Sequence, residues 1–543
     1  MALALAGYSD AFFRMSCPGR IVRDRIDPIV NPGKIAGHAH TISGGSGFKA
    51  DMSYADARAS KCSSCPIKVS PIYTFDTHYN GTLTDAQEDL SNYWTPQLYV
   101  RMNDGTFKPV PAMGDPNDTQ GGMTVYYLQR PSPSTEKLKA YPEGFRMLAG
   151  DNSKRTVGTN DLATRGVSYA CLGANKAETN NMPDYKCPGG LRAQIFFPSC
   201  WDGKNLDSDN HKSHMSYPDS QNYDNGPCPA SHPVHMMSLF YEVLYDTKLF
   251  DDQWNGTQHP FVFANGDTTG YGFHGDFVNG WDVNVLQKAI DTCTDLSGDV
   301  NACKAVTTFS YSENQQCQIP TTVNEQTGGT LQKLPGCNPL TPGGSCSDNT
   351  QFGAPPANFV DLTQSKKWEY SGCGGDDYYD RAFRSGFKGD DSMTVQMCVD
   401  YCSSLNMPYA GLEYSRECFC SDKLNSKYAP KDGVLGNCNY KCAGDSTQTC
   451  GGSGAMSIYH DCKGDTECRN WDINGNSGVQ AVSSSKPVPS STKTSSTKRT
   501  SSTAKQSSSS VKRPSTTIKT LTKTSSAARA TATKVARRHA RQI

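Results

Sequence analysis

The stretch MTVQMCVDYC (393–402) begins the most cysteine-dense part of this 543-residue chain, and it is followed by YAGLEYSRECFC (409–420) and CNYKCAGDSTQTCGG (438–452). A region of this size buries too little apolar surface to be stable on that basis alone. We therefore expect its cysteines to form structural disulfides. MTVQMCVDYCSSLN (393–406) is its expected helix, because Met393, Met397 and Val399 to Cys402 can share one face. The eight cysteines of residues 368–459 are Cys373, Cys398, Cys402, Cys418, Cys420, Cys438, Cys442 and Cys450.

This cysteine pattern resembles the WSC domain, a small disulfide-stapled α+β module linked in fungi to the cell wall and to carbohydrate binding. The resemblance covers residues 367–461. It implies that the protein works outside the cell, secreted or in the wall, with wall polysaccharide as its partner and a glucan as the first choice. Membrane-spanning WSC sensors have a long apolar helix, but no stretch here reaches the ~18 apolar residues that cross a bilayer.

Pyranose rings stack on exposed aromatic side chains, so the aromatic residues of the module are candidate sugar platforms. Tyr414, inside AGLEY, is expected to be buried instead. The candidate platforms are Trp368, Tyr370, Tyr378, Tyr379 and Tyr409, with Asp376, Asp377, Glu413 and Asn439 as partners for sugar hydroxyls.

The whole chain contains 22 cysteines, an even number that favours disulfides and an oxidising compartment. A zinc-binding nuclear protein is the alternative, because Cys62-Ser-Ser-Cys65 has the spacing of half a zinc site, although its partner pair is missing. Three sequons, at Asn80, Asn117 and Asn255, fit a secreted glycoprotein. The first seven residues, MALALAG, are apolar, and we interpret residues 1–11 as the remnant of a signal peptide.

The net charge of zero conceals an asymmetry, because residues 486–543 carry 14 Lys and Arg and no acidic residue. The rest of the chain therefore has 39 basic against 53 acidic residues. The Ser/Thr/Lys-rich composition of residues 462–543 predicts a disordered tail. Nucleic-acid binding is not expected, because no aromatic residue is interleaved with these charges to stack on bases.

Residues 12–346, with a core over about 12–290, are rich in Gly, Pro, Asn, Asp and Tyr. Short apolar runs such as QLYVRM (97–102) and MTVYYL (123–128) predict strands, so we expect a mainly β, sandwich-like domain. HMMSLFYEVLYD (235–246) is a further expected strand, and DVNVLQKAIDTCTD (282–295) is an expected helix. Residues 347–366 are the expected linker to the WSC-like module.

Histidines cluster in three blocks of this domain: DPIVNPGKIAGHAH (27–40), SCWDGKNLDSDNHKSHMSYP (199–218) and GYGFHGDFVNGWD (270–282). With these blocks, residues 12–290 resemble a secreted fungal family described only as a domain of unknown function, which often precedes WSC modules. That resemblance implies no particular activity.

The residues themselves suggest a His/Asp site. His38-x-His40 on a strand would point both imidazoles to one face, a spacing that suits two ligands of one divalent metal. Nearby carboxylates could complete a metal site or a metal-free acid–base pair acting on sugar, with Tyr217 or Tyr271 as acid or stacking surface. The candidate catalytic residues are His38, His40, Asp202, His211, His214, His274 and Asp276, of which His38 and His40 are the candidate metal ligands.

Three functions remain open on these observations. The N-terminal domain is a polysaccharide-degrading hydrolase or lyase, or it is a binding domain that extends the adhesion of the WSC-like module. In the third, the protein is a stress sensor or structural adhesin of the wall, and its histidines only hold loops. Cys200 as a nucleophile beside His211 is a further alternative, but a disulfide is the stronger expectation for it.

Overall fold

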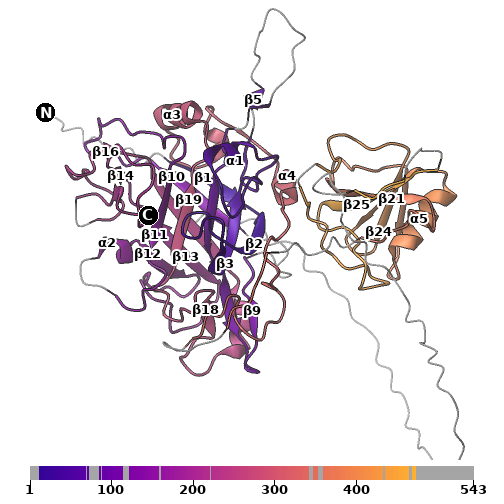
Figure 1. The fold of residues 1–543 in the computed structure, drawn as a ribbon, viewed down its shortest axis with the longest axis horizontal. Helices are drawn as coiled ribbons and strands as arrows, with labels where there is room; N and C mark the ends of the chain where they lie inside the picture. Colours follow the sequence, from indigo (N-terminus) through magenta and orange to yellow (C-terminus); the bar gives the residue numbers. More distant parts are fainter. Residues whose placement is uncertain are drawn as a thin grey trace, which may run out of the picture. The chain divides into compact units, whose positions relative to one another are not determined.

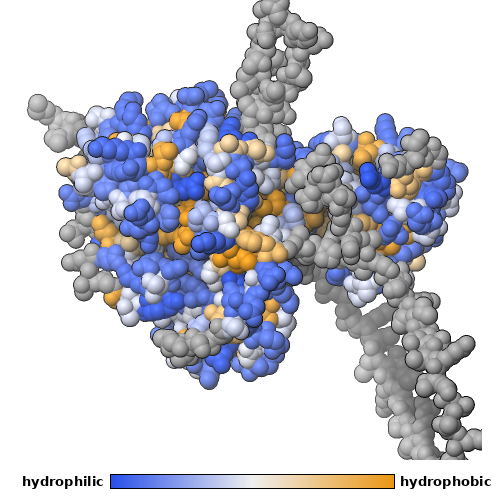
Figure 2. All heavy atoms as spheres, in the orientation of Figure 1, coloured by the Kyte–Doolittle hydropathy of each residue, from blue (hydrophilic) through white to orange (hydrophobic). Residues whose placement is uncertain are grey.

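The computed structural model describes residues 12–68, 70–71, 85–86, 88–113, 122–157, 161–219, 222–340, 347–352, 359–431, 434–463 and 468–471. These residues form a mainly β protein, as the sequence predicts, and every ladder between its named strands is antiparallel (Figure 1). The face shown in Figure 2 is mostly hydrophilic, with hydrophobic residues interspersed. The predicted signal remnant, the predicted tail beyond residue 471 and the sequons at Asn80 and Asn117 lie outside the described residues.

Two five-stranded sheets make up the body of the N-terminal region. The first has the order β1 (Phe12–Cys17), β10 (Met123–Leu128), β17 (Ser238–Tyr245), β13 (Leu191–Phe196) and β12 (Val167–Cys171). The second has the order β11 (Arg146–Gly150), β19 (His274–Val278), β7 (Asn92–Pro96), β3 (Ile35–Gly44) and β2 (Val22–Ile26). The predicted strands at 97–102, 123–128 and 235–246 are therefore confirmed, the first of them as β8 (Leu98–Arg101).

Alternation of side chains explains how these sheets pack. In β1 and β10 buried residues alternate with more exposed ones, as strands with one core face do. From the second sheet, Tyr93, Met147 and Phe277 enter the same hydrophobic core as residues of the first. Residues one position away on those strands therefore face the opposite side of the second sheet.

Smaller elements complete the N-terminal region. Its helices are α1 (Tyr54–Arg58), α2 (Leu162–Arg165), α3 (Val283–Thr292) and α4 (Tyr311–Gln316), with 3₁₀ turns at Thr247–Gln253 and Val300–Ala302. The short strands are β14 (Cys200–Trp201), β15 (Met215–Ser216), β16 (Val234–His235), β18 (Phe261–Phe263), β9 (Phe107–Pro109), β4 (Ile67–Lys68), β20 (Thr307–Thr308), β5 (Ser70–Pro71) and β6 (Asp85–Ala86). Helix α3 confirms the prediction for 282–295, and Asp282 caps it through the backbone N–H groups of Asn284 and Val285.

The C-terminal module has its own five-stranded antiparallel sheet and one helix among its described residues. Its strands are β21 (Trp368–Gly375), β25 (Ala455–Asp461), β23 (Tyr409–Glu413), β24 (Glu417–Ser421) and β22 (Gly386–Gly389). Its helix, α5 (Val395–Ser404), lies within the predicted stretch and buries Val395, Cys398, Val399 and Cys402. No helix of the described residues is long and apolar enough to cross a membrane.

The disulfides confirm the structural role predicted for the cysteines, because no described cysteine is free. The eight cysteines of the module pair among themselves as Cys373–Cys438, Cys398–Cys418, Cys402–Cys420 and Cys442–Cys450, and Cys462 pairs with Cys468. In the N-terminal region the pairs are Cys17–Cys65, Cys62–Cys317, Cys171–Cys187, Cys200–Cys228 and Cys293–Cys303. The zinc alternative for Cys62 and Cys65 and the nucleophile alternative for Cys200 are therefore wrong, since a disulfide sulfur has no thiolate to offer.

Candidate functional site

Three predicted histidines lie on two strands of the second sheet, His38 and His40 on β3 and His274 on β19, and β7 runs between these strands. His40 on β3 stands opposite Pro96 on β7, and on the other side of β7 Asp276 of β19 stands opposite Trp94. His274 lies two residues before Asp276 on β19, so the same antiparallel register places it beside Pro96 of β7. Because side chains alternate, His38, His40, His274 and Asp276 all point to the face opposite the main core. The prediction that His38 and His40 share a strand face is confirmed.

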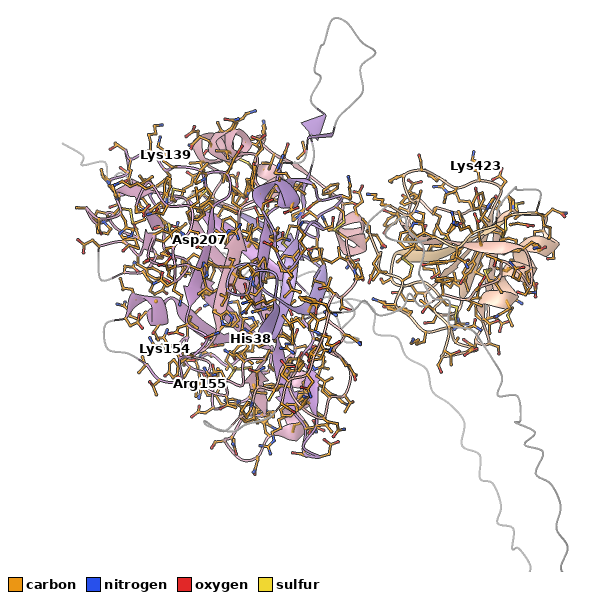
Figure 3. The ribbon with its side chains drawn as sticks, in the orientation of Figure 1. His38, Lys139, Lys154, Arg155, Asp207 and Lys423 are labelled. Carbon is orange, nitrogen blue, oxygen red and sulfur yellow. A yellow bond between two sulfur atoms is a disulfide. The ribbon has the colours of Figure 1, made fainter. Side chains whose placement is uncertain are left out.

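The imidazoles of this face, which we call the three-histidine cluster (His38, His40 and His274), converge closely. Nε2 of His38 lies 3.0 Å from Nε2 of His274, and one ligand nitrogen from each of the three rings lies within 4.8 Å of the others. The ring centroids of His38 and His40 are 4.4 Å apart. Two nitrogens that bind the same metal, each at about 2.0–2.1 Å, would lie roughly as far apart as the Nε2 atoms of His38 and His274 do here. Figure 3 marks His38 on the ribbon.

Backbone carbonyls fix the tautomers of two of these rings. Nδ1 of His40 lies 3.1 Å from the carbonyl oxygen of Ile26, and Nδ1 of His274 lies 2.9 Å from that of Gly272. A carbonyl only accepts, so each Nδ1 carries the proton and each Nε2 presents a lone pair to the cluster. Nε2 of His40 is buried without a hydrogen-bond partner. A carbonyl behind each imidazole is the arrangement that orients histidine ligands of metals.

Burial keeps the cluster uncharged. The pKa of His38 and of His40 is lowered well below its usual value, first by burial and then by the neighbouring histidines. Burial also lowers the pKa of His274 to about 4. Neutral imidazoles at physiological pH are the form that binds metal ions. The cluster can therefore supply three nitrogen ligands to one divalent cation.

Asp276 is the second unusual group on this face. Its side chain is fully buried, and neither carboxylate oxygen has a hydrogen-bond partner. Burial, and next the carboxylate of Asp27, raise the pKa of Asp276 well above its usual value, whereas Lys212 lowers it. A buried carboxyl group without partners costs free energy of folding, so its presence calls for a role beyond structure.

A pocket of about 260 Å³ lies at the end of β11, and we call it the β11 pocket; none of the three clustered histidines lines it. Gly150, the last residue of β11, is opposite His274 in the sheet and lines this pocket. Lys212 donates a hydrogen bond from Nζ to the carbonyl oxygen of Gly150, and burial lowers the pKa of its ammonium group. The residues that line the pocket include Gly150, Asp151, Lys154, Lys212, Tyr217 and Tyr271.

Of the seven predicted catalytic residues, three form the cluster, Asp276 lies on the same sheet face, and the other three do not join them. Asp202 stabilises its own turn by accepting hydrogen bonds from the backbone N–H groups of Lys204 and Asn205. His211 contacts Asp207, and His214 is held between Ser208 and the carbonyl oxygen of Arg146. These hydrogen bonds fit structural roles for the two histidines in their loop, and catalysis by Asp202, His211 and His214 stays a prediction.

Sequence reasoning missed Lys212 and Asp151. Lys212 lies between two histidines that were singled out, so its position in the 199–218 block was a usable signal. Asp151 follows β11 and carries no such signal. Tyr217 and Tyr271, which were considered as acid or stacking surface, both line the pocket.

Disulfides account for the remaining groups of potential metal ligands among the described residues. The groups around Cys200, Cys398 and Cys462 each contain bridged cysteines. The three-histidine cluster is thus the candidate metal site that the described part of the chain offers.

In the C-terminal module the predicted sugar platforms divide by exposure. Trp368 and Tyr370 are only 1% and 8% exposed, because β21 places both in the core of the module. They are therefore corrected to core residues. Tyr378 and Tyr379 are 76% and 93% exposed, and their rings stand perpendicular to each other with centroids 5.2 Å apart.

Two further tyrosines of the module differ in exposure from what the sequence suggests or from each other. Tyr409 is partly buried and stacks on His460, with ring centroids 4.7 Å apart. Tyr414, predicted to be buried, is 52% exposed because it lies in the turn after β23 with a positive φ of 52°. Asp376 and Glu413, predicted to contact sugar hydroxyls, are buried and both accept hydrogen bonds from Arg381, so they are structural.

Comparison with known proteins identifies both regions. Residues 27–281 match a family described as a domain of unknown function (DUF1996), and residues 370–452 match the WSC domain. A WSC domain-containing protein of Arthroderma benhamiae is 32% identical over 115 residues, 20% of this chain and 12% of that protein. Kremen protein 1 of Homo sapiens is 34% identical over 73 residues, 13% of this chain and 15% of that protein.

Xylosyltransferase oxt of Drosophila melanogaster is 38% identical over 87 residues, 15% of this chain and 10% of that protein. The chain spans between 10% and 15% of the length of these three relatives, so each match concerns one short segment. The chain therefore contains two known modules: residues 27–281 belong to the DUF1996 family, and residues 370–452 are a WSC domain.

Proposed function

We propose that this chain is an extracellular protein of the fungal wall that binds polysaccharide through its WSC domain and acts on polysaccharide through a divalent metal held in the DUF1996 domain. The observation that carries the proposed metal site is the convergence of one ring nitrogen from each of three buried imidazoles, those of His38, His40 and His274. A divalent ion there would supply an electrophile for a sugar oxygen or for water. The reaction class is hydrolysis or elimination.

Several observations support an extracellular location. Every described cysteine is bridged, which fits an oxidising compartment. Asn255, the acceptor of the one sequon among the described residues, is exposed in a turn and accessible to a glycosylating enzyme. The WSC domain supports binding to wall polysaccharide, and the exposed pair Tyr378 and Tyr379 is its best platform for a glucan chain.

The cluster favours particular metals. Imidazole nitrogen suits Zn²⁺, Cu²⁺, Ni²⁺ and Fe²⁺ better than it suits Mg²⁺ or Ca²⁺, which prefer oxygen ligands. Metal analysis of the secreted full chain by inductively coupled plasma mass spectrometry tests the site directly. We expect about one equivalent of a transition metal in the wild type and a loss of at least ~100-fold in affinity in His40→Ala, since removing a ligand costs more than removing its support.

A matched control is available in the same domain. His211→Ala/His214→Ala removes two histidines that lie outside the cluster, and we expect this variant to keep its metal. Equal metal loss in both variants, or no metal in a folded wild type, would contradict the site.

Product analysis then tests the activity. The wild type is incubated with β-glucans, chitin, mannans and uronans, with and without chelator, and the products are analysed by mass spectrometry. We expect new oligosaccharides whose formation requires both the metal and His40, and their mass distinguishes hydrolysis from elimination.

The alternative function is a wall adhesin or stress sensor in which the metal is structural. The burial of the three imidazoles favours it, since none is more than 6% exposed and structural metal sites are closed. A metal-loaded wild type that releases no product from any polysaccharide, but melts at lower temperature after chelation, would establish this alternative.

A further inference from the structure

The β11 pocket contains four charged side chains, of which two are already committed to each other. Lys154 contacts Asp161 and Thr164 through its ammonium group, and Asp161 also caps α2 by accepting from the N–H groups of Ala163 and Thr164. This ion pair fixes one wall of the pocket and offers little to a ligand.

Lys212 and Asp151 remain available. Lys212 has three N–H donors and spends one on the carbonyl oxygen of Gly150. Asp151 receives the backbone N–H and the hydroxyl of Ser153 on a single oxygen, Oδ1. The pocket therefore offers a ligand the remaining N–H donors of Lys212 and the oxygen Oδ2 of Asp151. The charges of these two side chains cancel.

Two tyrosines add apolar surface to this polar pair. The hydroxyl group of Tyr217 donates a 2.8 Å hydrogen bond to the carbonyl oxygen of Phe196, which holds its ring in place. Tyr271 lies three residues before His274 and contributes a second ring to the lining. Aromatic rings beside a small number of placed polar groups are the usual composition of a site for a polar organic ligand.

We propose that the β11 pocket binds one neutral pyranose ring, with Asp151 accepting from its hydroxyl groups and Lys212 donating to its oxygens. This inference rests on the proposed function, because Gly150 lines the pocket and pairs with His274 of the proposed metal site. Sugar binding in the pocket is nevertheless a separate event from metal binding. A charge of either sign on the ligand would be attracted by one of the two side chains, Lys212 or Asp151, and repelled by the other, so the pair favours a ring without a net charge.

The size of the pocket limits the ligand further. Its 260 Å³ is below the range of about 300–1,000 Å³ that sites for drug-sized ligands occupy. It accommodates a single ring rather than several linked ones, so the pocket receives the end of a polysaccharide chain.

Ligand-observed saturation-transfer NMR on the full chain tests this proposal. The probes are methyl β-glucopyranoside, the corresponding glucuronate and the corresponding glucosamine glycoside, in a Tyr378→Ala/Tyr379→Ala background that removes the two most exposed tyrosines of the WSC domain. We expect the neutral glycoside to bind at least about tenfold more tightly than either charged analogue. Lys212→Met and Asp151→Asn should each weaken its binding at least about tenfold.

Lys204→Met is the matched control, because Lys204 is an exposed lysine of the same 199–218 block and does not line the pocket. Its affinity for the glycoside should equal that of the parent. Thermal unfolding and metal content are measured for each variant, and Asp151→Asn keeps the test valid if Lys212→Met fails to fold.

The proposal is overturned by the absence of saturation transfer from the neutral glycoside, by tighter binding of a charged analogue, or by affinity unchanged in both pocket variants. Repeating the titration after chelation separates it from the proposed function. Glycoside binding in a chain that holds no metal would leave the pocket assignment standing and remove the metal-dependent activity, whereas metal without glycoside binding would do the reverse.

Discussion

The DUF1996 domain and the WSC domain each bury a group of ionisable side chains, and these two groups differ in how their members are paired. In the WSC domain the buried carboxylates of Asp376 and Glu413 share the guanidinium group of Arg381. In the DUF1996 domain the buried oxygens of Asp276 and Nε2 of His40 have no partner. Buried polar groups are normally satisfied. The difference therefore separates a network that stabilises its module from a group of side chains arranged for a ligand.

The paired network should be the more costly one to break. Arg381→Met leaves two buried carboxyl groups without their cation, so we expect the free energy of unfolding of the WSC domain to fall by about 3–5 kcal/mol. Chemical denaturation monitored by near-UV circular dichroism measures this. A loss below ~1 kcal/mol would show that the network contributes little.

The unpaired cluster should make stability depend on pH. The unfolded histidines take up protons below their usual pKa of about 6.5, whereas folded His274 stays neutral until about pH 4. In metal-free protein the free energy of unfolding should thus fall as the pH drops from 6.5 to 4, by up to ~1.4 kcal/mol per pH unit for each buried histidine. His274→Gln should reduce this slope, and His211→Gln serves as the comparison. Identical slopes in all three proteins would contradict the neutral cluster.

Asp276 tests the comparison from the other side. The pKa of Asp276 is raised in the folded state, so folding favours the protonated carboxyl group. The contribution of Asp276 to stability therefore becomes more unfavourable as the pH rises above 3.8, the usual pKa of an aspartate. We therefore expect Asp276→Asn to stabilise the domain by about 1–3 kcal/mol at pH 7 and to lose this gain toward pH 4. Differential scanning calorimetry at both values measures it. Destabilisation at pH 7 would indicate that the carboxylate stabilises the fold.

The smallest effect on stability is expected at the surface of the WSC domain. Tyr378→Ala/Tyr379→Ala should change the free energy of unfolding by less than about 0.5 kcal/mol and weaken binding to insoluble glucan by about tenfold, or ~1.4 kcal/mol. Pull-down isotherms measure the binding. Phe387→Ala, another exposed aromatic of the module, is the control that should bind normally.

The fold was predictable where a local pattern determines it. A short apolar run predicted β10, the alternation of residues 235–246 predicted β17, and apolar residues that can share one face predicted α5. The cysteine partners were not predictable, because Cys62 joins a residue 255 positions away and no local pattern encodes such a distance.

The candidate site was predicted in part for the same reason. His38 and His40 are two residues apart on one strand, which fixes their relative direction. His274 joins them only through the order of strands β19, β7 and β3, and a strand order is not encoded by residue spacing. The burial of Trp368 and Tyr370 likewise depends on which face of β21 meets the core, a choice that their aromatic character alone does not make.

Strand β19 lies between β11 and β7, although it is made after both of them. His274 is 236 positions from His38, so the ligand set does not exist in a nascent chain until almost the entire domain has been synthesised and its last central strand inserted. Binding of the proposed metal would then be a late event in biogenesis. A chain shortened before residue 274 would lack one of the three proposed ligands, so only a completed domain could hold the ion.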